Sequence, residues 1–244
     1  MPNLTRLLPA ITVLIAAFTA PAATDSLEAQ RKLFLEARAA LRENRLTRFG
    51  ELAGRLRDYP LYAYLDYARL RKRLDAASET EITDFLETWA DQPVSKRLKT
   101  AWLFSLGRRG RWELFLKHYQ GSSSVELQCY ALRARLEHDA GKPPVDAIIA
   151  LWLAGRSQPD SCDPLFSYLY DNDHITADLL WQRIGLAMDN NQPSLAGYLA
   201  RRLPAKDAAW VALWRNAHRN PSATLRDPRL NADEPVVRRI ILHA

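Results

Sequence analysis

Carboxylates that could act as a general acid or base are the first candidates for chemistry in this chain. Such a group needs a partner carboxylate, or a cleft that raises its pKa, to hold a proton near neutral pH. We expect each candidate at a helix start or on a solvent-exposed helix face, where carboxylates are common without any catalytic role. The candidates are Asp58, Asp66, Glu126 and Glu137. The sequence therefore assigns no catalytic residue.

Motifs for metals, cofactors and nucleophiles are absent from the sequence. It contains no phosphate-binding glycine loop, no G-x-S-x-G turn and no H-E-x-x-H pair. Residues 171–174, read as D-N-D-H, resemble the start of a calcium loop. The sixth position of that loop is Thr176 instead of glycine, and the twelfth is Gln182 instead of glutamate. We interpret the segment as a helix-capping turn and predict neither a metal nor a cofactor.

Aromatic residues could bind a ligand or another domain. Four tyrosines are spaced too closely to share one helical face, so some should be partly exposed. Exposed tyrosines could stack on sugar rings or contact a neighbouring domain, whereas buried ones would fill a helical core with their hydroxyls at its edge. We prefer the core interpretation for them, and for tryptophans such as Trp181. The tyrosines are Tyr59, Tyr62, Tyr64 and Tyr67.

The first residues are typical of a secretory leader. Arg6 gives a positive start, residues 7–20 are apolar, and residues 20–23 (A-P-A-A) supply small residues for cleavage. An apolar run of about 14 residues is too short to span a bilayer comfortably. We predict a signal peptide over residues 1–23 and an exported protein; a retained membrane anchor is the alternative.

The two cysteines of an exported chain suggest one disulfide. A Cys129–Cys162 bond would close a loop of about 34 residues and stabilise the protein by about 3–4 kcal/mol. Two buried thiols are the alternative. A redox-active pair is not expected, because the chain has no C-x-x-C spacing.

Apolar residues recur at helical spacing along almost the whole chain, and strand-like alternation is almost absent. We expect about a dozen short helices joined by short turns, hence an all-α protein. Such a pattern favours an α-solenoid of stacked helix pairs; a compact bundle is the alternative. Without a linker or a shift in composition, residues 24–244 are predicted to form one helical-repeat domain.

Several residues are expected to mark helix ends. Ser26 should cap the first long helix, and Pro60 should lie in the first turn of the helix that carries the tyrosines. Gly155 should stop a helix and Cys162 should open the next. The sequence breaks off at Ala244 within an amphipathic helix, so we expect either a further segment or a frayed last helix.

Two stretches carry a resemblance to a known family. Residues 151–166 read L-W-L-A-G-R-S-Q-P-D-S-C-D-P-L-F, and residues 58–67 read D-Y-P-L-Y-A-Y-L-D-Y. Residues 25–31 (D-S-L-x-x-Q-R) and 183–188 (R-x-G-L-A-M) extend the pattern from about Asp25 to the end. Together they resemble the long helical N-terminal part of the soluble lytic murein transglycosylases. Cys129 and Cys162 also resemble that family's cysteine pair.

The resemblance implies a right-handed superhelix of short helices, U-shaped or arc-shaped, in a periplasmic protein. Family members cut the bond between N-acetylmuramic acid and N-acetylglucosamine of peptidoglycan without water, which leaves 1,6-anhydromuramoyl ends. A separate C-terminal lysozyme-like domain holds the family's catalytic glutamate. Its Glu-Ser pair and its Gly-Leu-Met-Gln motif do not occur in this chain.

We therefore expect the N-terminal part of such an enzyme, which supports and orients a catalytic domain and is inactive alone. The alternative is a non-catalytic periplasmic scaffold that binds peptidoglycan or partner proteins. Expected partners are glycan strands and the protein's own catalytic domain. The net charge of +6 suits an anionic polymer, but an exported chain rarely meets nucleic acid, and no membrane contact is expected after the leader is removed.

Overall fold

The computed structural model describes residues 22–138 and 143–244, and these residues form helices and turns without a strand. The leader predicted over residues 1–23 lies outside the described residues, apart from Ala22 and Ala23 at the start of the first helix. None of the described helices is long and apolar enough to cross a membrane. The prediction of an all-α fold is confirmed.

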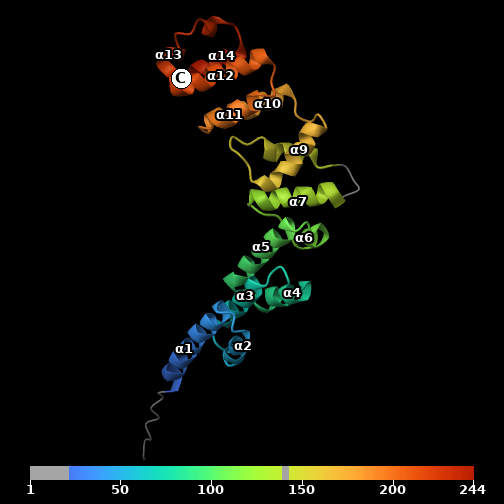
Figure 1. Cartoon of the computed structure of the whole chain (residues 1–244), viewed down its shortest axis with the longest axis vertical. Coiled ribbons are helices and arrows are strands. Elements are labelled where there is room, and N and C mark those ends of the chain that lie inside the picture. The colour runs from blue at the N-terminus through green and yellow to red at the C-terminus, as the bar shows by residue number, and fades with distance from the viewer. Residues whose placement is uncertain (1–21, 139–142) are drawn as a thin grey trace, which may run out of the picture. The chain divides into compact units, whose positions relative to one another are not determined.

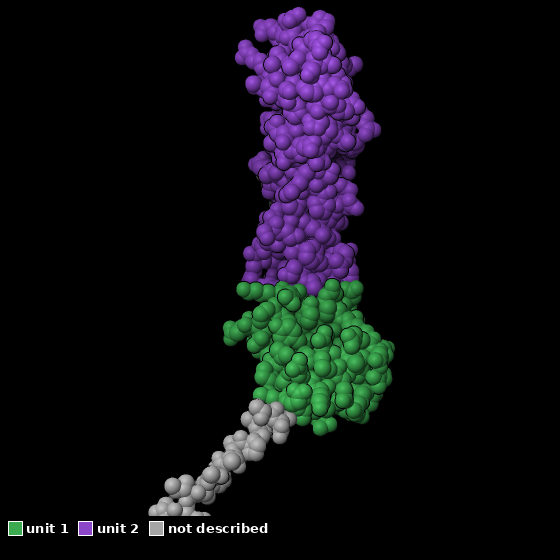
Figure 2. Space-filling view, turned by 90° about the vertical axis from the view of Figure 1, so that its left-hand side faces the viewer, with its two compact units in different colours: residues 1–98 green, residues 99–244 purple. Residues whose placement is uncertain are grey.

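The chain divides into two compact units, residues 1–98 and residues 99–244, which Figure 2 shows in green and purple. The division falls inside helix α5, where the sequence changes neither in composition nor in periodicity. Each unit is described separately.

Unit 1 contains the first four helices and the start of the fifth (Figure 1). Its helices contact their neighbours along the chain: α1 packs on α2 and α3, and α3 packs on α4. The core contains Phe34, Phe49, Leu52 and Leu65, all buried. The helices are α1 (Ala22–Arg42), α2 (Leu46–Gly54), α3 (Tyr62–Lys72), α4 (Glu79–Thr88) and α5 (Pro93–Arg108).

Unit 2 contains the end of α5 and the remaining helices (Figure 1), and a core cluster in it includes Trp152, Ile184 and Trp214. They are α6 (Trp112–His118), α7 (Val125–His138), α8 (Val145–Trp152), α9 (Asp163–Asp171), α10 (Ala177–Asp189), α11 (Pro193–Ala200), α12 (Ala205–Arg219), α13 (Pro221–Thr224) and α14 (Pro235–His243). Two short 3-10 helices, η1 (Asp160–Cys162) and η2 (Pro228–Asn231), lie between them.

Contacts between neighbours dominate unit 2 as well. Helix α7 packs on α6, α8 and α9, then α11 packs on α10 and α12, and α12 packs on α14. This pattern, in which the main contacts of each helix are with elements close to it in the chain, is that of an α-solenoid. The solenoid prediction is confirmed at this level. The handedness and the curvature stay predictions.

Three of the expected helix ends were wrong. Helix α1 begins at Ala22, so Ser26 lies within it and does not cap it. Helix α3 begins at Tyr62, and Pro60 lies in the turn before it. Proline is compatible with both positions, because each lacks a hydrogen bond from its backbone N–H. Helix α8 ends at Trp152, so Gly155 does not stop it. Cys162 does open the next helix as expected, because it is the N-cap residue of α9, which begins at Asp163.

A capping box that was not predicted from the sequence lies at the start of α4. The Ser78 side chain accepts a hydrogen bond from the backbone N–H of Glu81, and the Glu81 carboxylate accepts one from the backbone N–H of Ser78. These two bonds satisfy N–H groups that the helix itself leaves without a partner. The S-x-x-E spacing of the motif is visible in the sequence.

Candidate functional site

The four tyrosines of unit 1 are all half-buried. Tyr59 packs on Phe34 with ring centroids 5.4 Å apart, and Tyr62 packs on Trp89 at 6.1 Å. Tyr59, Tyr62 and Tyr64 lie against the core between α1, α2 and α3, but Tyr67 is not part of that cluster. Tyr59, Tyr62 and Tyr64 thus follow the preferred core interpretation. A contact of any of the four tyrosines to glycan or to another domain stays a prediction.

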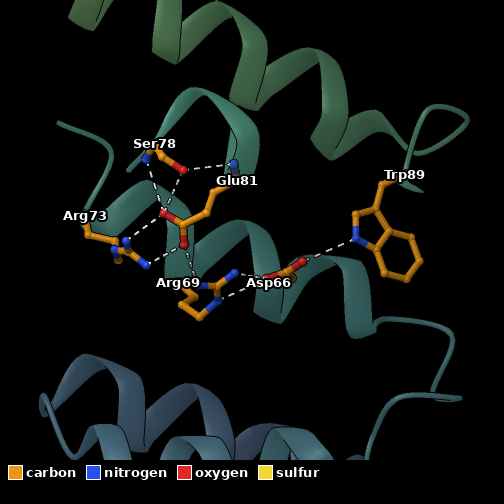
Figure 3. A network of polar contacts seen from close by, with 6 residues as sticks. All are labelled: Asp66, Arg69, Arg73, Ser78, Glu81 and Trp89. Carbon is orange, nitrogen blue, oxygen red and sulfur yellow. Dashed lines mark hydrogen bonds and ion pairs between the residues drawn. The ribbon is translucent and has the colours of Figure 1, made fainter. Parts of the chain in front are cut away.

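A network of charged groups joins α3 to α4 (Figure 3). It includes Trp89, the residue on which Tyr62 packs. The Asp66 carboxylate accepts hydrogen bonds from Nε and Nη2 of Arg69 at 3.1 and 2.8 Å. It also accepts one from the Trp89 indole at 3.5 Å. The Glu81 carboxylate accepts two hydrogen bonds from Arg73, each 2.8 Å long.

The contacts to Glu81 stabilise the ionised form of its carboxyl group. The backbone hydrogen bond from Ser78, followed by the hydrogen bond from Arg73, lowers the pKa of Glu81 below its ordinary 4.5. A group with a lowered pKa cannot hold a proton at neutral pH for a leaving group. The network is therefore suited to joining two helices and not to acid catalysis.

The other candidate carboxylates form hydrogen bonds to neighbouring side chains or lie exposed to solvent. Glu126 accepts a hydrogen bond from the Tyr130 hydroxyl at 3.1 Å, and Glu137 accepts one from the Trp112 indole at 2.6 Å. Asp58 is exposed in the turn before α3. Among residues 22–138 and 143–244, no three potential metal ligands cluster together.

Glu81 should make unit 1 less stable in acid. Because its pKa is lower in the folded state, the unfolded chain takes up the proton first as the pH falls. Its contribution is complete above pH 4.5 and is lost as the pH falls through the lower folded pKa. We expect Glu81→Gln to cost less than about 1 kcal/mol at neutral pH, because glutamine can still complete the capping box but loses the charged contact to Arg73.

Thermal melts followed by circular dichroism between neutral pH and pH 3 would measure this effect. The Glu81→Gln protein should show a shallower loss of Tm with acid than the wild type. Glu87→Gln is the matched control, because Glu87 is exposed on the same helix outside the network. Equal acid slopes for the wild type and Glu81→Gln would contradict the prediction.

The disulfide predicted between Cys129 and Cys162 is present in unit 2. Its sulfur atoms join α7 to η1, and both cysteines are completely buried. The bond fastens the segment after α8, which carries one of the two recognised sequence stretches, to the face of α7.

The recognised stretches at residues 151–166 and 183–188 meet around Arg183. Its side chain is buried, with 5% of the residue exposed. The guanidinium lies 4.6 Å from the ring centre of Trp152 and 5.6 Å from that of Phe166. Its Nε donates a hydrogen bond to the Ala154 carbonyl at 3.4 Å. Among the described residues, no carboxylate forms an ion pair with it.

Burial lowers the pKa of Arg183, and the hydroxyls of Tyr170 and Tyr198 act against that shift. A guanidinium is well suited to such a place, because it is weakly hydrated and stacks on aromatic faces. Arg202 adds a second contact of this kind, 3.8 Å above the ring of Tyr170. We interpret the cluster as a structural centre that fixes the loop after α8 against α10.

A cavity of about 290 Å³ opens on the surface of unit 2. Two tryptophans line it, Trp181 on α10 and Trp210 on α12, and both are half-buried. Trp181 was expected in the core. Its side chain does pack on the core, and it also lines the cavity. The other lining residues are Asp178, Asp207, Glu234, Pro235, Val236 and Arg239.

The sequence contains a repeated pattern that marks this cavity and that was not among the predicted sites. The pattern Asp-x-x-Trp occurs at residues 178–181 and again at residues 207–210, each time in the first two turns of a helix. Residues three apart share a helix face, so each aspartate lies beside its tryptophan. Only the fold shows that the two faces meet at one cavity.

Comparison with known proteins gives one consistent result, although no family model matches the chain. The soluble lytic murein transglycosylase of Salmonella typhimurium is 28% identical over 200 residues, which cover 82% of this chain and 31% of that protein. The crystal structure of an inactive mutant of the lytic transglycosylase Slt from Pseudomonas aeruginosa is 32% identical. The match has a TM-score of 0.77 and covers 86% of this chain and 34% of the Slt chain.

This chain is homologous to part of the soluble lytic murein transglycosylases. The 70-kDa enzyme of Escherichia coli agrees, with 25% identity and a TM-score of 0.76 over 90% of this chain and 36% of the enzyme. The resemblance seen in the sequence is confirmed. The chain spans about a third of the length of the transglycosylases that it matches.

Proposed function

We propose that this chain is the non-catalytic N-terminal helical part of a periplasmic soluble lytic murein transglycosylase. In that role it supports and orients a catalytic domain that cleaves the bond between N-acetylmuramic acid and N-acetylglucosamine and leaves 1,6-anhydromuramoyl ends. Glycan strands of peptidoglycan and the catalytic domain are its proposed partners.

The observation that carries the proposal is the extent of the match. Relatives named for this activity align with 82% to 84% of this chain but with 31% to 32% of their own length. The matched part is a series of stacked helices. Of its candidate carboxylates, Asp66, Glu126 and Glu137 accept hydrogen bonds from neighbouring side chains, and Asp58 lies exposed in a turn. Such a part supplies a framework and docking surfaces rather than chemistry.

The second candidate function is a periplasmic helical scaffold that binds peptidoglycan or partner proteins without any catalytic domain. The tryptophan-lined cavity of unit 2 is the observation that favours it, because it offers a binding site that needs no other domain.

The mass of the endogenous protein distinguishes the two. An antibody raised against residues 24–244 would be used on a periplasmic extract of the cells that make the protein. We expect a band far above the 27.8 kDa of this chain, because a catalytic domain should be covalently attached. A single band near or below 27.8 kDa would contradict the proposal and leave the scaffold. Absence of the protein from the periplasm would contradict both.

A further inference from the structure

We propose that the cavity between Trp181 and Trp210, called the tryptophan groove from here on, binds one pyranose ring of an uncharged oligosaccharide. The groove lies wholly within unit 2 and is formed by three helix starts. The proposal adds a binding function to the framework role proposed above.

The geometry of the groove comes from a repeated element. Asp178 and Trp181 lie on one face of α10, and Asp207 and Trp210 lie on one face of α12. The start of α14 completes the lining with Glu234, Pro235 and Val236. Both tryptophans are partly buried and pack on the core of the unit. Their rings are therefore held in place before a ligand arrives, which reduces the entropy lost on binding.

The chemistry of the lining suits a sugar. The face of a pyranose ring is a patch of C–H groups, and an indole offers a broad, rigid apolar surface for it. The edge of the sugar carries hydroxyls, and a carboxylate accepts hydrogen bonds from O–H donors with two oxygens. A cavity of about 290 Å³ is at the small end of ligand sites, which begin at about 300 Å³, so it suits one ring.

The charges around the groove disfavour both an anion and a cation. Three carboxylates line it against a single guanidinium, that of Arg239, so a phosphate or a carboxylate ligand would be repelled. Lys206 lies 3.0 Å from Glu234 and neutralises part of the acidic charge. Asp178 and Asp207 lie in the first turns of their helices, where the helix dipole offsets negative charge. The remaining field is weak, and this favours a neutral, hydroxyl-rich ligand over an ammonium group.

The choice of sugar for the test rests on the proposed function, which points to N-acetylglucosamine. Isothermal titration calorimetry with the whole chain and chitotetraose, an uncharged N-acetylglucosamine tetramer, should show saturable binding. Trp210→Ala should weaken binding about tenfold or more, because the stacking surface is lost. Trp210→Phe should restore much of the affinity, because it keeps an aromatic face.

Two aspartate variants keep the test informative if a tryptophan variant fails to fold. Asp178→Asn and Asp207→Asn change a charge and an acceptor without removing bulk, so the double variant should bind several-fold more weakly. Asp171→Asn is the matched control, because Asp171 is exposed in the same unit and outside the groove.

Three results would overturn the proposal: no heat of binding at millimolar chitotetraose, binding that the groove variants leave unchanged, or binding of choline in place of the oligosaccharide. Each of these can occur whatever the mass of the endogenous protein. Failure of the sugar-binding proposal is therefore distinguishable from failure of the proposed function.

Discussion

Removal of the Cys129–Cys162 disulfide is expected to lower the free energy of unfolding of unit 2 by about 3–4 kcal/mol. The bond spans 33 residues of sequence and joins α7 to the segment that follows α8. Breaking it allows that segment many more conformations in the unfolded chain, and this entropy opposes folding. Because both cysteines are completely buried, replacement by alanine avoids placing an unsatisfied hydroxyl in the core.

The measurement is urea unfolding of the Cys129→Ala/Cys162→Ala double variant, followed by tryptophan fluorescence. All the tryptophans except Trp89 lie in unit 2, so the signal reports mainly on that unit. The midpoint should fall clearly below that of the oxidised wild type. Dithiothreitol should destabilise the wild type and leave the variant unchanged. A variant as stable as the oxidised protein would contradict the prediction.

The second large effect is expected from Gly155→Ala, which adds a single methyl group. The helix α8 ends at Trp152, three residues earlier, so Gly155 does not itself terminate the helix as the sequence suggested. Glycine matters at this position because the backbone of the loop lies very close to α10. A Cβ atom built at Gly155 would overlap the backbone carbonyl of Leu186 and the side-chain amide of Asn190.

Neither neighbour can move easily. The Leu186 carbonyl belongs to the backbone of α10, and the Asn190 amide is held by a hydrogen bond to that carbonyl at 2.8 Å. We therefore expect Gly155→Ala to destabilise unit 2 by about 2–3 kcal/mol, the range of overpacked sites. Urea unfolding of the variant, compared with the wild type, measures the change.

Gly50→Ala is the matched control for this substitution. Gly50 lies within α2, and a Cβ atom there would meet nothing within 4 Å. Alanine is a better helix former than glycine, so this variant should be more stable than the wild type by about 0.5–1 kcal/mol. The same chemical change should therefore have opposite signs at the two positions. A neutral Gly155→Ala variant would show that α10 can shift away from the loop.

Local patterns in the sequence predicted a chain of short helices but misplaced several of their ends. The cysteine count suggested the disulfide. The error at Pro60 arose because a proline before a helix and a proline in its first turn satisfy the same local rule. Ser78 and Glu81 show the opposite case, since their spacing gave enough information to predict the capping box.

Contacts between distant residues could not be predicted in this way. Nothing in the local sequence says that Arg183 lies between Trp152 and Phe166, because those residues come from different helices. The role of Gly155 likewise depends on how closely α10 approaches the loop. The two Asp-x-x-Trp motifs of the tryptophan groove could be found in the sequence, but their meeting at one cavity depends on the packing of α10, α12 and α14.

The central claim, that this chain is a non-catalytic part of a lytic transglycosylase, is tested most directly by its action on peptidoglycan. Purified residues 24–244, shown to be folded by circular dichroism, would be incubated with sacculi, and the soluble products separated by chromatography and mass spectrometry. The full-length Escherichia coli enzyme is the positive control. We expect no 1,6-anhydromuropeptides above the level of a sample without protein. Release of these products in proportion to time and protein concentration would contradict the claim.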